Sequence, residues 1–236
     1  MTIKRILVLA NSTKHHPRSC VAGRELVDDE NGGSRLGGWI RPVSDHDEGA
    51  LDLAERRLAN AQDPRPLDII QVSLSKPGNN LLQPENWLIQ AGQSWTKVDS
   101  NDAPHWPSLI EKPEDLWFDP SQKIDRAGET FLLRRPNFQS LYLIRPDAFY
   151  FQIRSKVWDG YAKKQLRGIF TCCGRHYDFP LTDPLIGRKY YPDFPKTKDG
   201  NIQPEDSRKI FLCVSLTPPF HDLHYKVIAT VFEVAP

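Results

Sequence analysis

The sequence lacks the motifs around which many hydrolases and nucleotide-binding enzymes are built. It contains no Gly-x-Ser-x-Gly nucleophile elbow and no Gly-x-x-x-x-Gly-Lys phosphate loop. The glycine-rich stretch at 32–38 fits neither a phosphate-loop nor a dinucleotide spacing, so we interpret it as a flexible surface loop. These absences weigh against an enzyme. A metal-dependent nuclease or nucleotide-processing enzyme stays open as a third alternative, with Asp178, Asp183 and Asp193 as its acidic residues.

Cysteine is scarce and poorly spaced for metal binding or for a disulfide framework. The four cysteines are Cys20, Cys172, Cys173 and Cys213, and two of them are adjacent. Adjacent thiolates do not have the two-residue spacing that lets a pair face one zinc ion. We therefore expect reduced, mostly buried thiols, with no bound metal and no cofactor.

Long hydrophobic runs are also missing. The apolar stretch near the N-terminus, 6–10, is too short for a membrane span or for the core of a signal peptide, and no small-residue cleavage site follows it. We interpret residues 3–10 as a buried first strand. The expectation is a cytoplasmic protein with no membrane association.

What the sequence does contain is a high number of prolines and several strand-like segments. Twenty prolines in 236 residues favour many short elements separated by ordered turns, because proline is excluded from helix interiors and central strands. Ile70, Val72 and Leu74 alternate with polar residues at the period of a strand, and two further apolar segments lie at 209–216 and 225–232. The predicted fold class is mostly β with short helices, in compact barrels or a sandwich.

Charge is balanced overall but unevenly distributed. The net charge is +1, yet residues 134–175 hold nine basic and two acidic residues, whereas residues 76–133 carry five basic and nine acidic ones. Within the basic stretch, 149–158 and 163–171 alternate, with the Asp159-Gly160 turn dipeptide between them. The pattern predicts a hairpin with one apolar face and one polar face. The six side chains of that polar face are Gln152, Arg154, Lys156, Lys163, Gln165 and Arg167.

A ligand-facing role for this hairpin competes with an ordinary half-buried strand pair, which needs a solvated side in any case. Nucleic acid requires cations that meet phosphates and flat side chains that stack on bases. Trp39 and Arg41 lie two apart on a predicted strand and so share a face, although core packing and an ion pair are equally good interpretations of them. The candidate nucleic-acid-binding residues are Lys14, Arg18, Trp39, Arg41, Arg154, Lys156, Tyr161, Lys163, Arg167, Arg175 and Tyr177.

Short motifs at both ends of the chain carry a family resemblance. They are the opening segment 4–12, the Cys-Val-Ala-Gly at 20–23 and the Gly-Trp-Ile-Arg-Pro-Val-Ser at 38–44. The closing segments 211–216 and 225–229 fit the same pattern. Together they resemble the prokaryotic dual OB-containing domain (DuOB) family. The resemblance implies two OB-like β-barrels in one chain, a nucleic-acid-binding role and an association with prokaryotic conflict or defence systems; it supplies no catalytic residues.

We place the domain boundary where the charge changes sign, near the proline after Arg135. The first OB-like barrel would span 1–133, with an irregular insertion, and the second would span 134–236 and carry the basic hairpin. The leading functional hypothesis is a module that binds single-stranded or structured DNA or RNA. The alternative is a protein-interaction or sensor module whose basic face meets an acidic partner encoded in the same operon.

Overall fold

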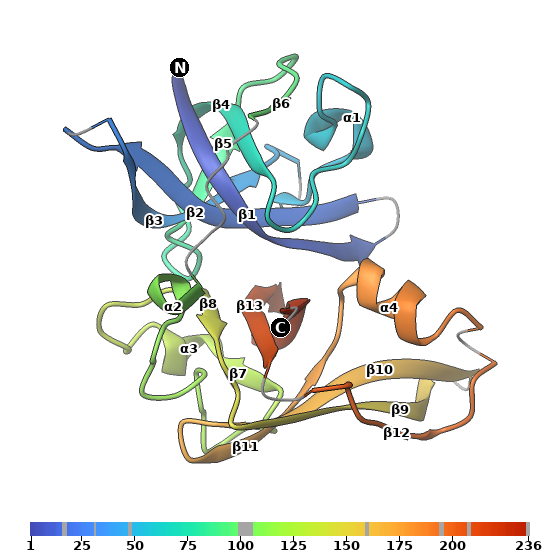
Figure 1. Ribbon diagram of the computed structural model, residues 1–236. Coiled ribbons are helices and arrows are strands. Elements are labelled where there is room, and N and C mark those ends of the chain that lie inside the picture. The colour runs from blue at the N-terminus through green and yellow to red at the C-terminus, as the bar shows by residue number, and fades with distance from the viewer. Residues whose placement is uncertain are drawn as a thin grey trace. The chain divides into compact units, whose positions relative to one another are not determined.

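The computed structural model describes residues 1–15, 18–30, 32–46, 49–98, 106–158, 161–193, 196–206 and 209–234, and of residues 14, 15, 106, 107, 158, 161 and 162 only the backbone. The chain divides into two compact units, Met1–Leu109 and Ile110–Pro236 (Figure 1). Both units are built mainly from strands, as expected. No helix in the described part of the chain is long and apolar enough to cross a bilayer.

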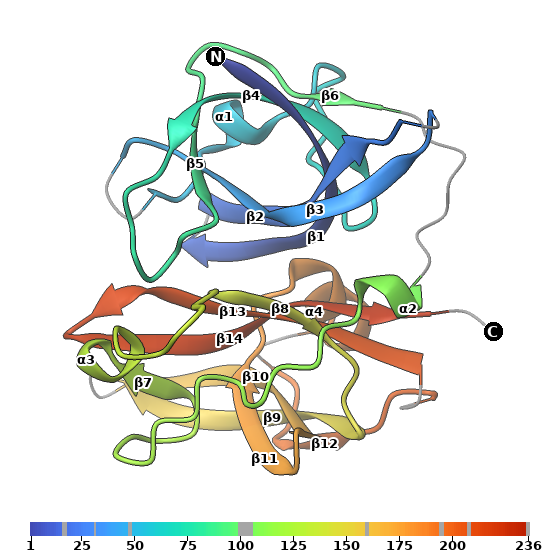
Figure 2. The same cartoon turned by 90° about the vertical axis from the view of Figure 1, so that its left-hand side faces the viewer.

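Five strands of the first unit close into a barrel (Figure 2). Neighbouring strands pair in the order β1-β2-β3-β5-β4, and β4 returns to pair with β1. Among these described barrel pairs, only β3–β5 is parallel. A short strand, β6, extends the sheet at β4, and the one-turn helix α1 lies between β3 and β4 in sequence. The elements are β1 (Thr2–His15), β2 (Arg18–Asp28), β3 (Ser34–Val43), α1 (Leu53–Arg56), β4 (Ile69–Pro77), β5 (Asn86–Ile89), β6 (Thr96–Lys97) and α2 (Trp106–Leu109).

Alternation of apolar and polar residues creates the core of this barrel. Ile70, Val72 and Leu74 of β4 are fully buried, which confirms the alternation predicted from the sequence. Gly23 lets two strands pack closely, because a Cβ at this position would lie 2.0 Å from the Leu7 carbonyl oxygen. The buried core cluster contains Ile6, Val8, Val21, Ile40, Leu51, Leu58, Ile70, Val72, Leu74 and Trp95.

The second unit contains two four-stranded sheets, ordered β11-β10-β9-β12 and β7-β14-β13-β8. Gly168 of β10 allows the sheets to approach, since a Cβ there would lie 2.3 Å from Cδ1 of Ile228 in β14. The elements are β7 (Arg126–Gly128), α3 (Glu129–Leu132), β8 (Leu141–Ile144), β9 (Ala148–Trp158), β10 (Tyr161–Cys172), β11 (Arg175–Pro180), α4 (Pro184–Tyr190), β12 (Gly200–Ile202), β13 (Ile210–Phe220) and β14 (Leu223–Glu233).

The second unit follows the same strand path as the first. Its first strand is broken into β8, which pairs with β13, and β9, which pairs with β10. A helix, α4, again separates the third and fourth strands, and a parallel bridge from Leu181 to Ile228 links the end of β11 to β14. This unit is a half-barrel, because a single bridge replaces the continuous β3–β5 ladder of the first unit. Two OB-like barrels are therefore present, as predicted, and only the first is closed.

The boundary between the units differs from the position expected from charge. Residues 110–133 belong to the second unit, where β7 pairs with β14 and α3 follows directly. The charge change near residue 133 therefore falls inside one folded unit. Residues 113–117 lie in this stretch and form neither helix nor strand. There the Leu116 amide donates to the Tyr177 hydroxyl, and the Trp117 indole donates to the Gln139 carbonyl. These long-range hydrogen bonds hold the segment in place.

A buried lysine connects this segment to the barrel strands. Lys226 of β14 is fully buried, and its Nζ donates to the Ile124 carbonyl at 3.0 Å. Burial lowers the pKa of Lys226 from 10.5 to about 8, against the attraction of Asp115, Asp119 and Asp125. The charged form is thus less favourable in the folded protein than in the unfolded chain.

This lowered pKa predicts a distinctive dependence of stability on pH. Between about pH 8 and pH 10.5 the unfolded chain binds more protons at Lys226 than the folded protein does. Stability contributed by this residue should therefore rise with pH across that window, by roughly 3 kcal/mol in total, and stay flat below it. Urea unfolding of the native protein and of Lys226→Met at several pH values isolates the effect. Parallel pH profiles for the two proteins would contradict it.

Candidate functional site

The β9–β10 hairpin places the six predicted polar residues on one face. Its register sets Lys156 opposite Lys163, Arg154 opposite Gln165 and Gln152 opposite Arg167. Residues that face each other in an antiparallel pair project from the same side of the sheet. We call this surface the basic face; its members are Gln152, Arg154, Lys156, Lys163, Gln165 and Arg167. The predicted two-sided hairpin is thereby confirmed, and its apolar side buries Phe151 and Ile153.

Exposure along the basic face increases towards the turn of the hairpin. Arg167, at the base, is 4% exposed, whereas Lys156 and Lys163 are exposed. The opposite side of the hairpin also becomes exposed beyond Ile153, since Val157 is 71% exposed. The hairpin therefore extends past the apolar core as a two-stranded arm, with its cations at the outer end.

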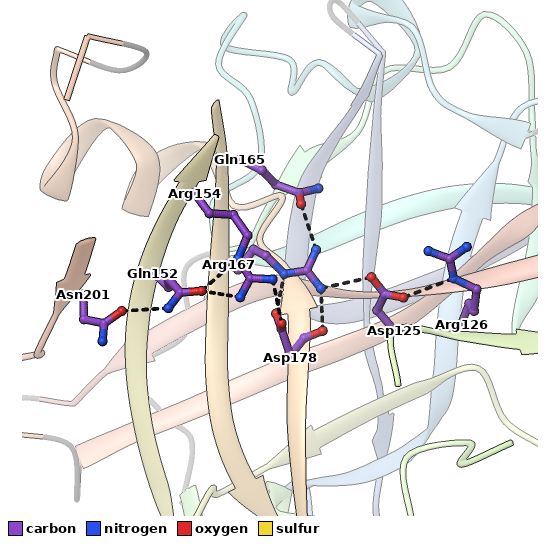
Figure 3. A network of polar contacts seen from close by, with 8 residues as sticks. All are labelled: Asp125, Arg126, Gln152, Arg154, Gln165, Arg167, Asp178 and Asn201. Atoms are coloured by element: carbon purple, nitrogen blue, oxygen red, sulfur yellow. Dashed lines mark hydrogen bonds and ion pairs between the residues drawn. The ribbon is translucent and has the colours of Figure 1, made fainter. Parts of the chain in front are cut away.

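A network of polar contacts anchors the base of the arm (Figure 3). Arg167 forms an ion pair through Nε with the Asp178 carboxylate and donates through Nη1 to Gln165 Oε1 at 2.8 Å. Its Nη2 reaches Asp125 Oδ2 at 3.0 Å and the Asp178 carbonyl at 2.6 Å. These bonds connect β10 to β11 and to the segment before β7. Arg167 is therefore a structural residue, whose donors are directed into the protein.

Arg154 lies at the transition between the buried network and the exposed arm. Its Nη1 pairs with Asp178 Oδ2 at 2.9 Å, and its Nε donates to Gln152 Oε1 at 2.8 Å. Gln152 is held in turn by Asn201 of β12 at 2.8 Å. The Arg154 side chain is nevertheless 41% exposed. It is positioned by two partners and still accessible to a ligand.

The outer end of the arm carries two opposed lysines. Lys156 and Lys163 face each other directly across the strand pair, an arrangement that is destabilising for like charges. On the other side of the hairpin, Lys164 pairs with Asp199, whose carboxylate also accepts from the Ser155 amide at 2.8 Å. The hydrogen bond from Lys164 lowers the pKa of Asp199 to about 2.

Two predicted residues of β11 have different surroundings. Arg175 is exposed, and its guanidinium lies over the Phe118 ring at 4.0 Å from the centroid. Tyr177 is 1% exposed, accepts from the Leu116 amide at 3.1 Å and stacks on Phe170. Burial raises the pKa of Tyr177 to about 12. Tyr177 is therefore a core residue with no free ring face for a base.

The predicted residues of the first unit are mostly enclosed. Arg41 is 5% exposed and contacts Glu85 at 3.4 Å and Asn86 at 3.3 Å, so the ion-pair interpretation applies. Trp39 is 8% exposed, with the Arg24 guanidinium 5.9 Å from its ring centroid. Arg18 is exposed and pairs with Asp52 at 2.9 Å.

Lys14 and Tyr161 have side chains outside the described part of the structure. The predicted residues thus fall into two groups, one in each unit. The second unit brings together Arg154, Lys156 and Lys163 on the basic face, whereas Arg175 of β11 lies opposite Cys172 and projects from the other side of the sheet.

Two of the three acidic residues considered for metal chemistry, Asp178 and Asp183, have structural partners. Asp178 pairs with two arginines, and Asp183 caps α4 by accepting from the Leu185 and Ile186 amides. His46, Asp52 and Glu55 also cluster near α1. There Asp52 and Glu55 form a capping box, and Glu55 accepts from the Ser44 hydroxyl at 2.6 Å. The capping of α1 therefore explains why these side chains lie close together.

One exposed feature was not predicted from the sequence. The segment between the apolar stretches 209–216 and 225–232 forms the tip of the β13–β14 hairpin, and β13 continues to Phe220. Phe220 is 52% exposed and its ring contacts that of His221. Two prolines before Phe220 suggested a loop, because proline disrupts strand ladders. A register shift between Leu216 and Pro219 accommodates them here.

Comparisons with known proteins identify a family but no curated relative. The model of a family described as the dual OB-containing domain matches residues 4–231. No curated protein matches the chain. Among solved structures, a replication protein A heterotrimer bound to ssDNA matches at 12% identity and a TM-score of 0.37, over 97% of this chain and 49% of that chain. The chain thus spans about half the length of that match.

Two further solved structures are comparably distant. One, described as the molecular basis for abrogation of activation of pro-inflammatory cytokines, matches at 11% identity and a TM-score of 0.31. The other, described as structural mimicry for functional antagonism, matches at 11% identity and a TM-score of 0.32. Each alignment covers 98% of this chain and 91% of the other.

The network around Arg167 generates a stability prediction. Arg167→Met leaves the carboxylates of Asp125 and Asp178 without their buried guanidinium, which should destabilise the protein by roughly 3 kcal/mol. Lys163→Ala, on the exposed end of the same face, should change stability by less than about 0.5 kcal/mol. Urea denaturation followed by circular dichroism measures both. Equal midpoints for Arg167→Met and the native protein would show that the network does not anchor the arm.

Proposed function

The chain belongs to the dual OB-containing domain family, and we propose that it binds nucleic acid, preferentially single-stranded, by meeting phosphates with the basic face of its second barrel. The observation that carries the proposal is the pair of opposed, exposed lysines, Lys156 and Lys163, at the outer end of the β9–β10 arm. Exposed cations on neighbouring strands are what contacts to phosphates require.

The position of the arm within the barrel supports this proposal. By strand order, β9, β10 and β11 are the last part of strand one and strands two and three of the second barrel. OB-type barrels bind oligonucleotides over strands two and three and the adjoining loops. The basic face lies on the outer side of these strands, because Phe151, Phe170 and Phe179 fill the inner side.

The residues proposed for phosphate contact are those whose cationic groups are accessible. They are Lys156 and Lys163 at the end of the arm and Arg154 held by Asp178, whereas Arg175, opposite Cys172, projects from the other side of the sheet. Arg18 is a candidate on the first barrel. Arg41 and Arg167 support the fold instead, since their guanidinium groups are buried beside carboxylates.

The small size of the basic face favours a single-stranded nucleic acid as its ligand. The exposed cations cover one short strand pair, which suits the few nucleotides contacted by an OB-type barrel. Phosphate contacts of this kind do not read sequence. We therefore propose binding with little base specificity at the basic face, to DNA and RNA alike.

The proposal predicts a specific response to charge reversal. Lys156→Glu/Lys163→Glu should weaken binding of a labelled single-stranded oligonucleotide at least about tenfold. It should also flatten the dependence of log affinity on log salt by about 0.7 for each lost phosphate contact. Fluorescence anisotropy at several salt concentrations measures both quantities.

A matched control makes the same change in net charge at another place in the second unit. Lys112 and Lys123 are exposed and lie outside the basic face, so Lys112→Glu/Lys123→Glu should retain most of the affinity and the native salt slope. Equal losses in the two double variants would indicate a general charge effect and not a site. Failure of the native protein to bind any oligonucleotide at low salt would instead favour an acidic protein as partner of the basic face.

A further inference from the structure

The tip of the β13–β14 hairpin carries an exposed pair of aromatic rings. Phe220 is 52% exposed, His221 is exposed, and their ring centroids lie 4.2 Å apart at an interplanar angle of 67°. We call Phe220 and His221 the aromatic tip. No residue predicted from the sequence to bind a ligand belongs to it.

The backbone at the aromatic tip adopts an unfavourable conformation. His221 and Asp222 have φ angles of 50° and 58°, in the left-handed region that a two-residue type I′ turn requires. The β10–β11 turn of the same unit uses Cys173 and Gly174 at φ angles of 55° and 69°, with glycine at the second position. The aromatic tip has no glycine, so its turn keeps a side chain at both central positions despite the steric cost.

The hairpin below the tip is held firmly. The Tyr225 amide donates to the Thr217 hydroxyl at 3.1 Å, and the His224 ring bonds to the Thr217 carbonyl at 2.8 Å. Pro218 and Pro219 restrict the backbone before Phe220. The Asp222 carbonyl accepts from the Glu129 amide at 3.2 Å. The rings are therefore presented on a rigid support, which reduces the entropy lost on binding.

The chemistry of the tip suits a base and not a phosphate. Residues 217–224 contain no lysine or arginine, and Asp222 adds a negative charge beside the rings. A phosphate would be repelled there, whereas the face of an unpaired base is neutral and stacks on aromatic side chains. The hairpin is also the connection between strands four and five of the second barrel, a loop that borders the ligand in OB-type barrels.

We infer that the aromatic tip stacks on unpaired bases of a single-stranded nucleic acid, with Phe220 as the principal contact and His221 supporting its ring. This inference rests on the proposed function. It adds a base-contacting element that the basic face lacks, because the predicted stacking residues Trp39 and Tyr177 are buried. Base contact and phosphate contact are thereby assigned to separate parts of the second unit.

Two probes separate stacking from charge. One is a labelled oligothymidylate of about twenty nucleotides, longer than the site of one OB-type barrel, and the other is an abasic strand of equal length. Phe220→Ala should weaken binding of oligothymidylate by about 5- to 100-fold and leave the abasic strand unaffected. Its salt slope should equal that of the native protein, since no phosphate contact is lost.

Control variants test whether binding requires an aromatic ring or only apolar surface area. Phe220→Leu keeps apolar area without a flat π-face and should lose most of the affinity, whereas Phe220→Trp should retain it. Leu133→Ala removes an equally exposed side chain, 52%, from the same unit and should bind normally. His221→Asn/Asp222→Gly relaxes the turn, so it should raise the unfolding midpoint and reduce oligothymidylate affinity only moderately.

The other possible results of these experiments would each overturn the inference. Native affinity in Phe220→Ala, or equal loss on both probes, would overturn it. If Lys156→Glu/Lys163→Glu lost binding while Phe220→Ala did not, the proposed function would stand and the aromatic tip would have no part in it. If the native protein bound neither probe at low salt, the proposed function and this inference would fail together.

Discussion

The second barrel depends on one buried guanidinium. Arg167 lies between β10, β11 and the segment before β7, and it satisfies Asp178, Gln165 and Asp125 together. Burying an arginine is costly unless each donor finds an acceptor. The continuous ladder that closes the first barrel has no equivalent in the second, where β11 and β14 share a single bridge. The Arg167 network supplies side-chain connections in that part of the fold.

This network also explains why the exposure of the cations varies along the basic face. Near the core, cations are neutralised by carboxylates from neighbouring segments; farther out, Lys156 and Lys163 are exposed. Arg154 belongs to both regions, because Asp178 accepts from it while 41% of its side chain stays exposed. A rigid base with an accessible end is the arrangement that a preorganised binding surface requires.

Sequence alone predicted the local features of this chain and missed the long-range ones. The hairpin was predictable because alternation has a period of two residues, and β-strands keep that period without help from distant segments. The burial of Arg167 was not predictable from the sequence. Its partners Asp178 and Asp125 lie 11 and 42 residues away along the chain. The same holds for the boundary at Leu109, because the irregular residues 110–133 join the second unit through β7 and Lys226, which no periodicity reveals.

Counting charges along the sequence also misses contacts between residues that are distant in the chain. The nine basic residues of 134–175 suggested a strongly positive surface, yet Arg135, Arg154, Lys164 and Arg167 form ion pairs. Their partners, Asp115, Asp178, Asp199 and Asp125, all lie outside the counted stretch. A field over a surface depends on charges that are close in space, and pairing cancels much of it. Of the five basic residues that remain, only Lys156 and Lys163 lie at the end of the arm. A strand bound there would contact few phosphates, so its affinity would depend on contacts to bases as well.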